Sequence, residues 1–164
     1  MASTDLITSL HPVVSFVIPT LNRGKYVLRA VRSCLKNDDE NVCVEVVVID
    51  SSSNDGSFEE LQQEFSTDNR VKLLQNPRGS GPIKSWLEGV ESTSGDYFTF
   101  VWSDDLISPL FLKTLLKPLL DARADVAIGF GKNELLDHES DFSPTLGQFS
   151  ILDRREILLR YYRI

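Results

Sequence analysis

The sequence predicts an α/β domain with a mostly parallel sheet and helices on both faces. Short β-branched runs alternate with amphipathic segments from end to end, a pattern typical of parallel βαβ units. One of these runs is apolar at nearly every position, as expected for a strand covered on both faces. The 164 residues are 41% hydrophobic and 25% charged, as in ordinary globular proteins. We therefore expect a single domain over residues 1–164.

The first half of the chain contains three expected strands separated by two expected helices. Pro19 closes the first strand, and Asn22 is the expected N-cap of the helix that follows it. Apolar residues recur at helical spacing in the first helix. We place the strands at residues 13–18, 42–49 and 71–74, and the helices at 23–35 and 57–65.

In the second half, strands and helices continue to alternate, but this pattern weakens toward the C-terminus. A helix at 83–91 has its apolar residues on one face, namely Ile83, Trp86, Leu87 and Val90. Pro109 suits the first turn of the next helix. The elements expected here are a strand at 97–102, a helix at 109–120 and a fifth strand at 124–130. Together with the elements of the first half, they form the core of the domain, which we expect to span residues 13–136. Residues 137–164 are expected to form a loop and a helix, the helix at 151–162.

Charge and cysteine content exclude several classes of protein. A net charge of −7 argues against a nucleic-acid or anionic-membrane binder, which needs a basic face. No apolar run has the roughly 18 residues of a membrane span, and the N-terminus lacks the features of a signal peptide. Cys34 and Cys43 cannot build a disulfide framework or a four-ligand zinc site. We therefore expect buried free thiols and, by default, a cytoplasmic protein.

Polar clusters follow three of the expected strands. They occupy residues 19–23, 50–56 and 103–105. Because parallel strands end at one edge of a sheet, all three are expected to line one crevice. Each cluster alone has a simpler interpretation as a turn or helix cap, and Asp104-Asp105 alone as a partner for a helix N-terminus. Their joint occurrence favours a ligand site.

The crevice suits a divalent cation and a phosphorylated ligand. Asp104 and Asp105 repel each other unless positive charge lies nearby. Carboxylates are hard oxygen ligands that suit Mg²⁺ or Mn²⁺, and such an ion can neutralise a diphosphate leaving group. Four basic residues flank these loops, although each alone is more simply a solvated surface cation: Arg23, Lys25, Arg78 and Lys84.

Three segments resemble the motifs of the GT-A fold, family 2 type glycosyltransferases. They are residues 14–23, 46–57 and 95–105, in the order and spacing of that family, and the resemblance covers residues 13–136. It implies a GT-A, Rossmann-like sheet and an inverting transfer from a nucleotide sugar, most often a UDP- or dTDP-sugar. It also implies Mg or Mn, and a sugar, lipid-linked or protein acceptor in polysaccharide biosynthesis.

The resemblance also implies roles for individual residues. Pro19, Thr20 and Asn22 would border the nucleoside, and Asp50 would read the base. Ser52 and Asp55 belong to the second motif, and Lys84 resembles a residue that approaches the diphosphate. Ser103, Asp104 and Asp105 resemble the end of an Asp-x-Asp motif, with Asp104 as metal ligand beside Asp105. The sequence departs from the family motifs at two positions. Trp102 stands where the family has the first acidic residue of the Asp-x-Asp motif, and Ser51 stands where the second motif usually has another aspartate after Asp50.

The general base of the transfer has no clear candidate in this sequence. Asp137, Glu139 and Asp141 lie in the expected C-terminal loop and match no family motif. The chain thus resembles the donor-binding part of an enzyme, truncated or completed by another chain, and apolar surface left open would favour a homo-oligomer. One alternative is a nucleotide-sugar-binding module without turnover. Another is a doubly wound signalling domain, ranked last because its acidic pair usually follows the first strand.

Overall fold

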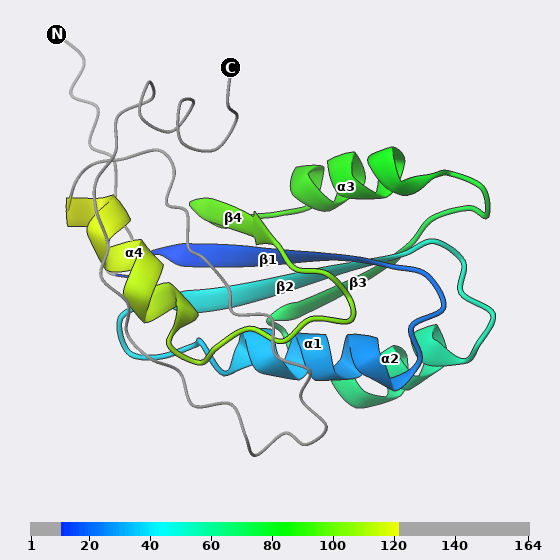
Figure 1. Ribbon diagram of the computed structural model, residues 1–164, viewed down its shortest axis with the longest axis horizontal. Coiled ribbons are helices and arrows are strands. Elements are labelled where there is room, and N and C mark those ends of the chain that lie inside the picture. The colour runs from blue at the N-terminus through cyan, green and yellow to red at the C-terminus, as the bar shows by residue number, and fades with distance from the viewer. Residues whose placement is uncertain (1–10, 122–164) are drawn as a thin grey trace, which may run out of the picture. The chain divides into compact units, whose positions relative to one another are not determined.

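The computed structural model describes residues 11–121, in which strands and helices alternate (Figure 1). The elements agree with the predicted ones except at their ends, where boundaries are least sharp. The predicted strand at 124–130, loop at 137–147 and helix at 151–162 lie outside the described residues. The elements are β1 (Val13–Thr20), α1 (Lys25–Leu35), β2 (Cys43–Asp50), α2 (Ser57–Phe65), β3 (Val71–Gln75), α3 (Pro82–Glu91), β4 (Tyr97–Phe100) and α4 (Phe111–Asp121).

The chain divides after Pro109 into two compact units. The first holds the sheet with α1, α2 and α3, and the second begins at Leu110 and contains α4. The helix α4 begins at Phe111, so Pro109 precedes it and does not form its first turn as predicted. Within residues 11–121, no helix has the length and apolar character needed to cross a bilayer.

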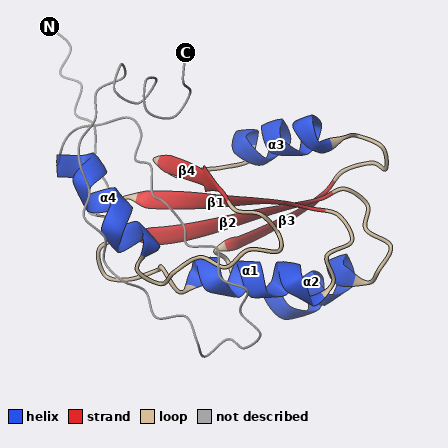
Figure 2. Cartoon of the chain, in the orientation of Figure 1, coloured by secondary structure: helices blue, strands red, loops and turns tan. Residues whose placement is uncertain are grey.

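The four strands form one parallel sheet in the order β3-β2-β1-β4 (Figure 2). Thr20 at the end of β1 is paired with Asp50 at the end of β2, and Asp50 is paired with Gln75 at the end of β3. The segments that follow these strands therefore leave the sheet at one edge. This confirms the predicted parallel sheet and brings the polar clusters to the same side.

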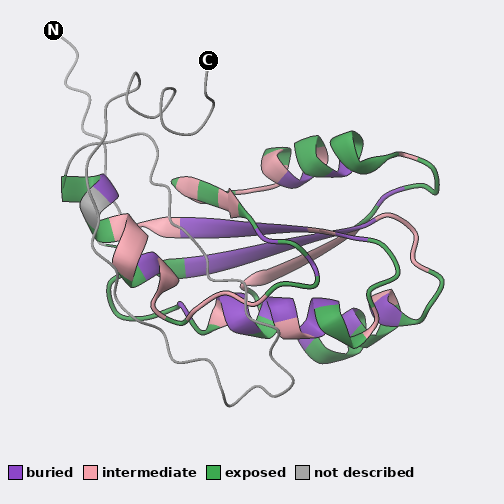
Figure 3. Ribbon diagram, viewed as in Figure 1, coloured by how far each residue is buried: buried purple, intermediate pink, exposed green. Residues whose placement is uncertain are grey.

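Helices cover both faces of the sheet. The helix α3 packs on β1 and β2 from one face, while α1 packs on the same strands from the other face and also contacts α2 (Figure 1). The β-branched and aromatic side chains of β1 and β2 are consequently buried, as Figure 3 shows along both strands. Fully burying one such side chain contributes about 1.5–3 kcal/mol.

The helix α3 packs on the sheet through small residues, and its predicted apolar face is largely exposed. Ile83 is 68% and Leu87 60% exposed, whereas the buried residues of the helix are Ser85 and Gly89. A Cβ atom at Gly89 would lie 2.5 Å from Val17 Cγ1 and 2.7 Å from Ile49 Cδ1. The helix therefore lies so close to the sheet that only a residue without a side chain fits there.

A buried carboxylate joins three strands at the opposite end of the sheet. Glu45 on β2 lies 2.6 Å from Lys72 Nζ on β3 and accepts a 2.5 Å hydrogen bond from Ser15 Oγ on β1. Ser94 donates both its N–H and its hydroxyl to the same carboxylate, at 2.8 and 2.7 Å. Burial raises the pKa of Glu45, but these donors outweigh it and lower the pKa from about 4.5 to about 2.

We expect Gly89→Ala to lower the free energy of unfolding by about 1–3 kcal/mol, because the added methyl must displace Val17 and Ile49. Alanine favours a helix over glycine by about 1 kcal/mol, so the loss would be due to the sheet contact and not to the helix itself. Urea unfolding followed by circular dichroism measures it. Glu91→Ala, at an exposed position of α3, is the matched control. A Gly89→Ala protein as stable as that control would contradict the close packing.

We expect the stabilising effect of Glu45 to depend on pH. Because its folded pKa is lowered, the contribution is complete above about pH 4.5 and is lost as the pH falls toward about 2. Glu45→Gln should cost about 1–3 kcal/mol at pH 7 and progressively less below pH 4.5. Urea unfolding at pH 3 to 7 measures the difference, with Glu91→Gln as control. A difference that stays constant over this range would refute the assignment.

Candidate functional site

A cavity of about 620 Å³ lies at the edge where the parallel strands end. Its walls come from the loops after β1, β2 and β4, and from the loop that leads into α3. The three polar clusters predicted to share a crevice therefore do so. The lining residues are Pro19, Thr20, Leu21, Asn22, Arg23, Ser51, Ser52, Asn54, Arg78, Gly79, Gly81, Pro82, Ser85, Trp86, Trp102, Ser103 and Asp104.

Asp55 fastens the loop after β2 to the start of α1. Its Oδ2 accepts a hydrogen bond of 2.9 Å from the Gly24 N–H, and its Oδ1 accepts bonds from the Ser57 hydroxyl and N–H at 2.5 and 3.1 Å. The bond from the Ser57 hydroxyl is the largest of the effects that lower the pKa of Asp55. The carboxylate predicted to bind the nucleotide sugar thus holds two loops together, outside the cavity wall.

Asn22 also links the two loops and does not act as the predicted N-cap. Its Oδ1 accepts a 2.9 Å bond from the Asn54 N–H, and its own N–H donates to Ser53 Oγ at 2.8 Å. The helix begins later, and Gly24 occupies the N-cap position without a side-chain bond. Asn22 has φ +52°, in the left-handed region that few residues other than asparagine tolerate. Its backbone conformation serves the loop that lines the cavity.

Asp50 lies completely buried beneath the loop that follows β2. Its carboxylate accepts bonds from the hydroxyl and the N–H of Ser53, the latter at 2.9 Å, and from Gln75 Nε2 at 3.0 Å. It is not among the residues that line the cavity, so its predicted role in reading a base stays a prediction. Ser52, by contrast, lines the cavity and donates its hydroxyl to the Asn76 carbonyl at 2.6 Å.

Thr20 lines the cavity and carries a buried hydroxyl without a partner within residues 11–121. The residue lines the cavity and is 4% exposed, and its Oγ1 has no hydrogen-bond partner among the described residues. A buried polar group left unpaired costs about 1–3 kcal/mol. Such a cost is usually met at places where a ligand or an ordered water completes the bond. The Thr20 hydroxyl is therefore a buried polar group beside this cavity that still needs a partner.

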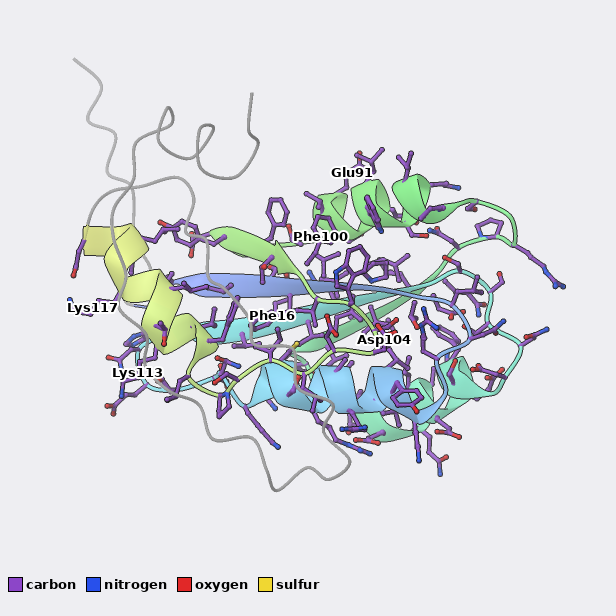
Figure 4. The ribbon with its side chains drawn as sticks, in the orientation of Figure 1. Phe16, Glu91, Phe100, Asp104, Lys113 and Lys117 are labelled. Carbon is purple, nitrogen blue, oxygen red and sulfur yellow. The ribbon has the colours of Figure 1, made fainter. Side chains whose placement is uncertain are left out.

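Asp104 and Arg23 form an exposed ion pair at the mouth of the cavity. Asp104 Oδ2 lies 3.8 Å from Arg23 Nη2, and each side chain is about half exposed (Figure 4 labels Asp104). Exposed pairs contribute only about 0.2–1 kcal/mol, so a ligand can separate them at little cost. The backbone turns here, because the Asp105 N–H donates to the Trp102 carbonyl at 3.0 Å. Asp105 is exposed and lies outside the cavity wall.

Two arginines, rather than the predicted lysine, bring positive charge to the cavity. Arg23 and Arg78 line it, whereas Lys84 is exposed on α3 outside the cavity wall. The predicted approach of Lys84 to a diphosphate stays a prediction. Arg78 precedes two glycines with positive φ, Gly79 and Gly81, which let the loop turn sharply into the helix.

The acidic residues fit a metal ion that a phosphate shares, but not one held by the protein alone. Within residues 11–121, no group of three or more histidine, cysteine or acidic side chains is placed to enclose an ion. Mg²⁺ commonly binds through one or two carboxylates and completes its shell with phosphates and water. Asp104, with Asp105 beside it, suits that arrangement.

Two tryptophans form part of the cavity wall. Trp86 of α3 and Trp102 after β4 both line it, with ring centroids 5.7 Å apart at an interplanar angle of 62°. Trp86 was expected only on the apolar face of a helix, and Trp102 only as a departure from a family motif. The position of Trp102 two residues before Asp104, at the end of a strand, is the sequence signal that marks it. The candidate bases Asp137, Glu139 and Asp141 lie outside the described residues.

Comparisons with known proteins agree with this geometry. The model of the family described as glycosyl transferase family 2 matches residues 15–152. The glycosyltransferase GlyG of Streptococcus pneumoniae serotype 4 is 32% identical over 120 residues, which are 73% of this chain and 39% of GlyG. The chain therefore spans about two fifths of that relative's length.

Solved structures confirm the GT-A glycosyltransferase fold. S. aureus TarS 1–349 in complex with UDP-GlcNAc is 28% identical with a TM-score of 0.57, covering 66% of this chain and 31% of TarS. The mannosyltransferase PcManGT from Pyrobaculum calidifontis, solved with GDP-Man and Mn²⁺, matches with a TM-score of 0.59. The match covers 66% of this chain and 32% of the PcManGT chain. Its identity of 21% supports the fold alone.

We expect Asp55→Asn to loosen both loops of the cavity, because an amide cannot accept from Gly24 and Ser57 as a carboxylate does. The free energy of unfolding should fall by about 1–3 kcal/mol. Hydrogen exchange of the Gly24 and Ser57 amides should accelerate more than exchange in β1 and β2. Glu60→Gln, at an exposed position of the same helix α2, is the control. Unchanged exchange at both amides would disprove this role of Asp55.

Proposed function

Because this chain belongs to glycosyl transferase family 2, we propose that it binds a nucleotide-diphosphate sugar and takes part in inverting transfer of the sugar to an acceptor hydroxyl. The observation that carries the proposal is the convergence of three polar strand-end segments on one cavity. Its volume of about 620 Å³ falls in the range of small-molecule sites. The chain spans only part of its relatives' length, so the complete activity is proposed for the whole enzyme.

The nucleoside is proposed to lie over the loops after β1 and β2. Pro19, Thr20, Asn22 and Ser52 line this part of the cavity, and the unpaired Thr20 hydroxyl needs a hydrogen-bond partner. The hydrogen bonds that Asp55 and Asn22 make hold the two loops in place before a ligand arrives. The entropy lost in ordering the loops on binding is therefore smaller. The family resemblance favours a UDP- or dTDP-sugar as the donor.

The diphosphate is proposed to lie near Arg23, Arg78 and Asp104. The two arginines can donate bidentate hydrogen bonds to phosphate oxygens. Asp104, with Asp105 beside it, would hold a Mg²⁺ or Mn²⁺ ion, and Ser103 would contact the nucleotide sugar. A bound divalent cation neutralises negative charge on the leaving diphosphate. When Arg23 turns from Asp104 toward a phosphate, it frees that carboxylate for the ion.

The proposal also concerns the acceptor and the general base of the transfer. A sugar, lipid-linked or protein hydroxyl is the proposed acceptor class, with a place in polysaccharide biosynthesis. A base must lie within hydrogen-bond reach of that hydroxyl, and Asp137, Glu139 and Asp141 are the candidates within this chain. The second candidate function is a nucleotide-sugar-binding module without turnover, favoured only if no base exists. Release of free nucleotide from a nucleotide sugar in the presence of an acceptor would exclude this second function.

We expect nucleotide binding to depend on Mn²⁺ through Asp104. Calorimetric titration with UDP, dTDP and GDP, each with and without Mn²⁺, should find one nucleotide whose affinity the ion raises. Asp104→Asn should lower the affinity in Mn²⁺ by about tenfold, because the neutral amide is a poorer ligand for a hard cation. Glu91→Gln, on the exposed side of α3, is the control. If Asp104→Asn retained the full effect of Mn²⁺, the proposed metal position would be wrong.

A further inference from the structure

We infer that Trp86 and Trp102 form an aromatic wall against which the sugar ring of the donor packs, an inference that rests on the proposed function. Both rings line the cavity and contact each other edge to face. They nevertheless stay open to solvent, since Trp86 is 37% and Trp102 52% exposed. The rings therefore offer apolar surface at the cavity that the described residues leave uncovered.

The position of Trp102 is fixed by its neighbours. Val101 and Ser103 on either side are buried, at 2% and 5% exposure, and the Val101 N–H donates to the Val17 carbonyl at 2.9 Å. In an extended segment, alternate side chains point to opposite sides. With its neighbours directed inward, Trp102 lies on the outer side of the segment, where it lines the cavity. Its exposed ring offers apolar surface that a ligand in the cavity would cover.

The order of the strands places this wall at the sugar end of the donor. The loops after β2, β1 and β4 follow one another along the edge of the sheet. A nucleoside over the first two loops, with its diphosphate at Arg23 and Asp104, directs the remaining group toward the end of β4. Trp102 lies two residues before Asp104 in the chain, at that end. The ring attached to the diphosphate is thus the group that reaches the wall.

A hexose ring has the chemistry to bind there. Its hydroxyl groups point outward around the ring, while its C–H bonds form an apolar face that can pack on an aromatic ring. Ser103 and Asp104, which follow Trp102 in the chain, are polar residues at the border of the wall. Ligand sites generally combine apolar walls with a few convergent polar groups. The wall therefore suits a sugar ring better than a wholly apolar ligand.

The experiment uses the fact that the 164-residue chain has two tryptophans, and both form the wall. Tryptophan emission, excited at a wavelength at which the four tyrosines do not absorb, consequently reports on this wall alone. The protein is titrated in Mn²⁺ with UDP and UDP-glucose, dTDP and dTDP-glucose, and GDP and GDP-mannose. For the nucleotide that binds by calorimetry, we expect the sugar form to change the emission and the bare diphosphate to leave it nearly unchanged.

Variants separate the wall from the rest of the site. We expect Trp102→Ala to weaken binding of the sugar form about tenfold while affinity for the bare diphosphate stays within about twofold. Trp102→Phe should keep most of the affinity because it preserves an aromatic face. Phe98→Ala is the matched control, since Phe98 on β4 is similarly exposed, at 50%, and lies outside the cavity wall. Circular dichroism verifies that each variant is folded.

Several outcomes would overturn the inference. An equal emission change with the bare diphosphate would mean that the wall faces the nucleoside. Unchanged affinity of folded Trp102→Ala for the sugar form would mean that the donor sugar does not contact Trp102. These results would leave nucleotide binding, and thus the proposed function, intact. Absence of binding by every nucleotide would instead reject the proposed function and the wall with it.

Discussion

The parallel pairing of β1 with its two neighbours is the constraint on which the rest of the structure depends. In a parallel sheet every connection must return across a face before the next strand begins, so all strands end at one edge. The contacts of Glu45 on β2 with Ser15 on β1 and Lys72 on β3 mark this register, because a slip by one residue would turn the carboxylate to the other face of the sheet, away from both partners. The segments after β1, β2 and β4 meet at one cavity as a direct result.

Many polar residues at this edge hold the loops and do not face the cavity. Asp50 and Asp55 are saturated by hydrogen bonds from Ser53, Gln75, Gly24 and Ser57. Asn22 and Ser52 adopt positive φ, a conformation that costs free energy unless the surroundings require it. The loops are thus preorganised by the buried carboxylate of Asp50 and by the exposed carboxylate of Asp55. The groups left to meet a ligand are hydroxyls, arginines and Asp104.

Local patterns in the sequence predicted the elements well, whereas contacts between elements were less visible. The β-branched runs and helical spacings are properties of neighbouring residues, so β1, β2 and α2 were located closely. The exposed face of α3 was not foreseen, because periodicity identifies an apolar face but not the close approach that Gly89 permits. Likewise, Asp50 and Asp55 are typical ligand residues by type, and only the tertiary hydrogen bonds reveal their supporting role.

The charges at the cavity suggest why Trp102 is tolerated where the family has an acid. Among the described residues, the lining carries two arginines and a single carboxylate, Asp104, which already pairs with Arg23. This lining is positive without a cation, so a diphosphate can enter before a metal ion does. In the proposed site, a bound diphosphate would supply the oxygen ligands that Asp104 lacks. A second carboxylate would then not be needed to recruit the ion, and its position could be given to an aromatic ring, which we propose contacts the sugar.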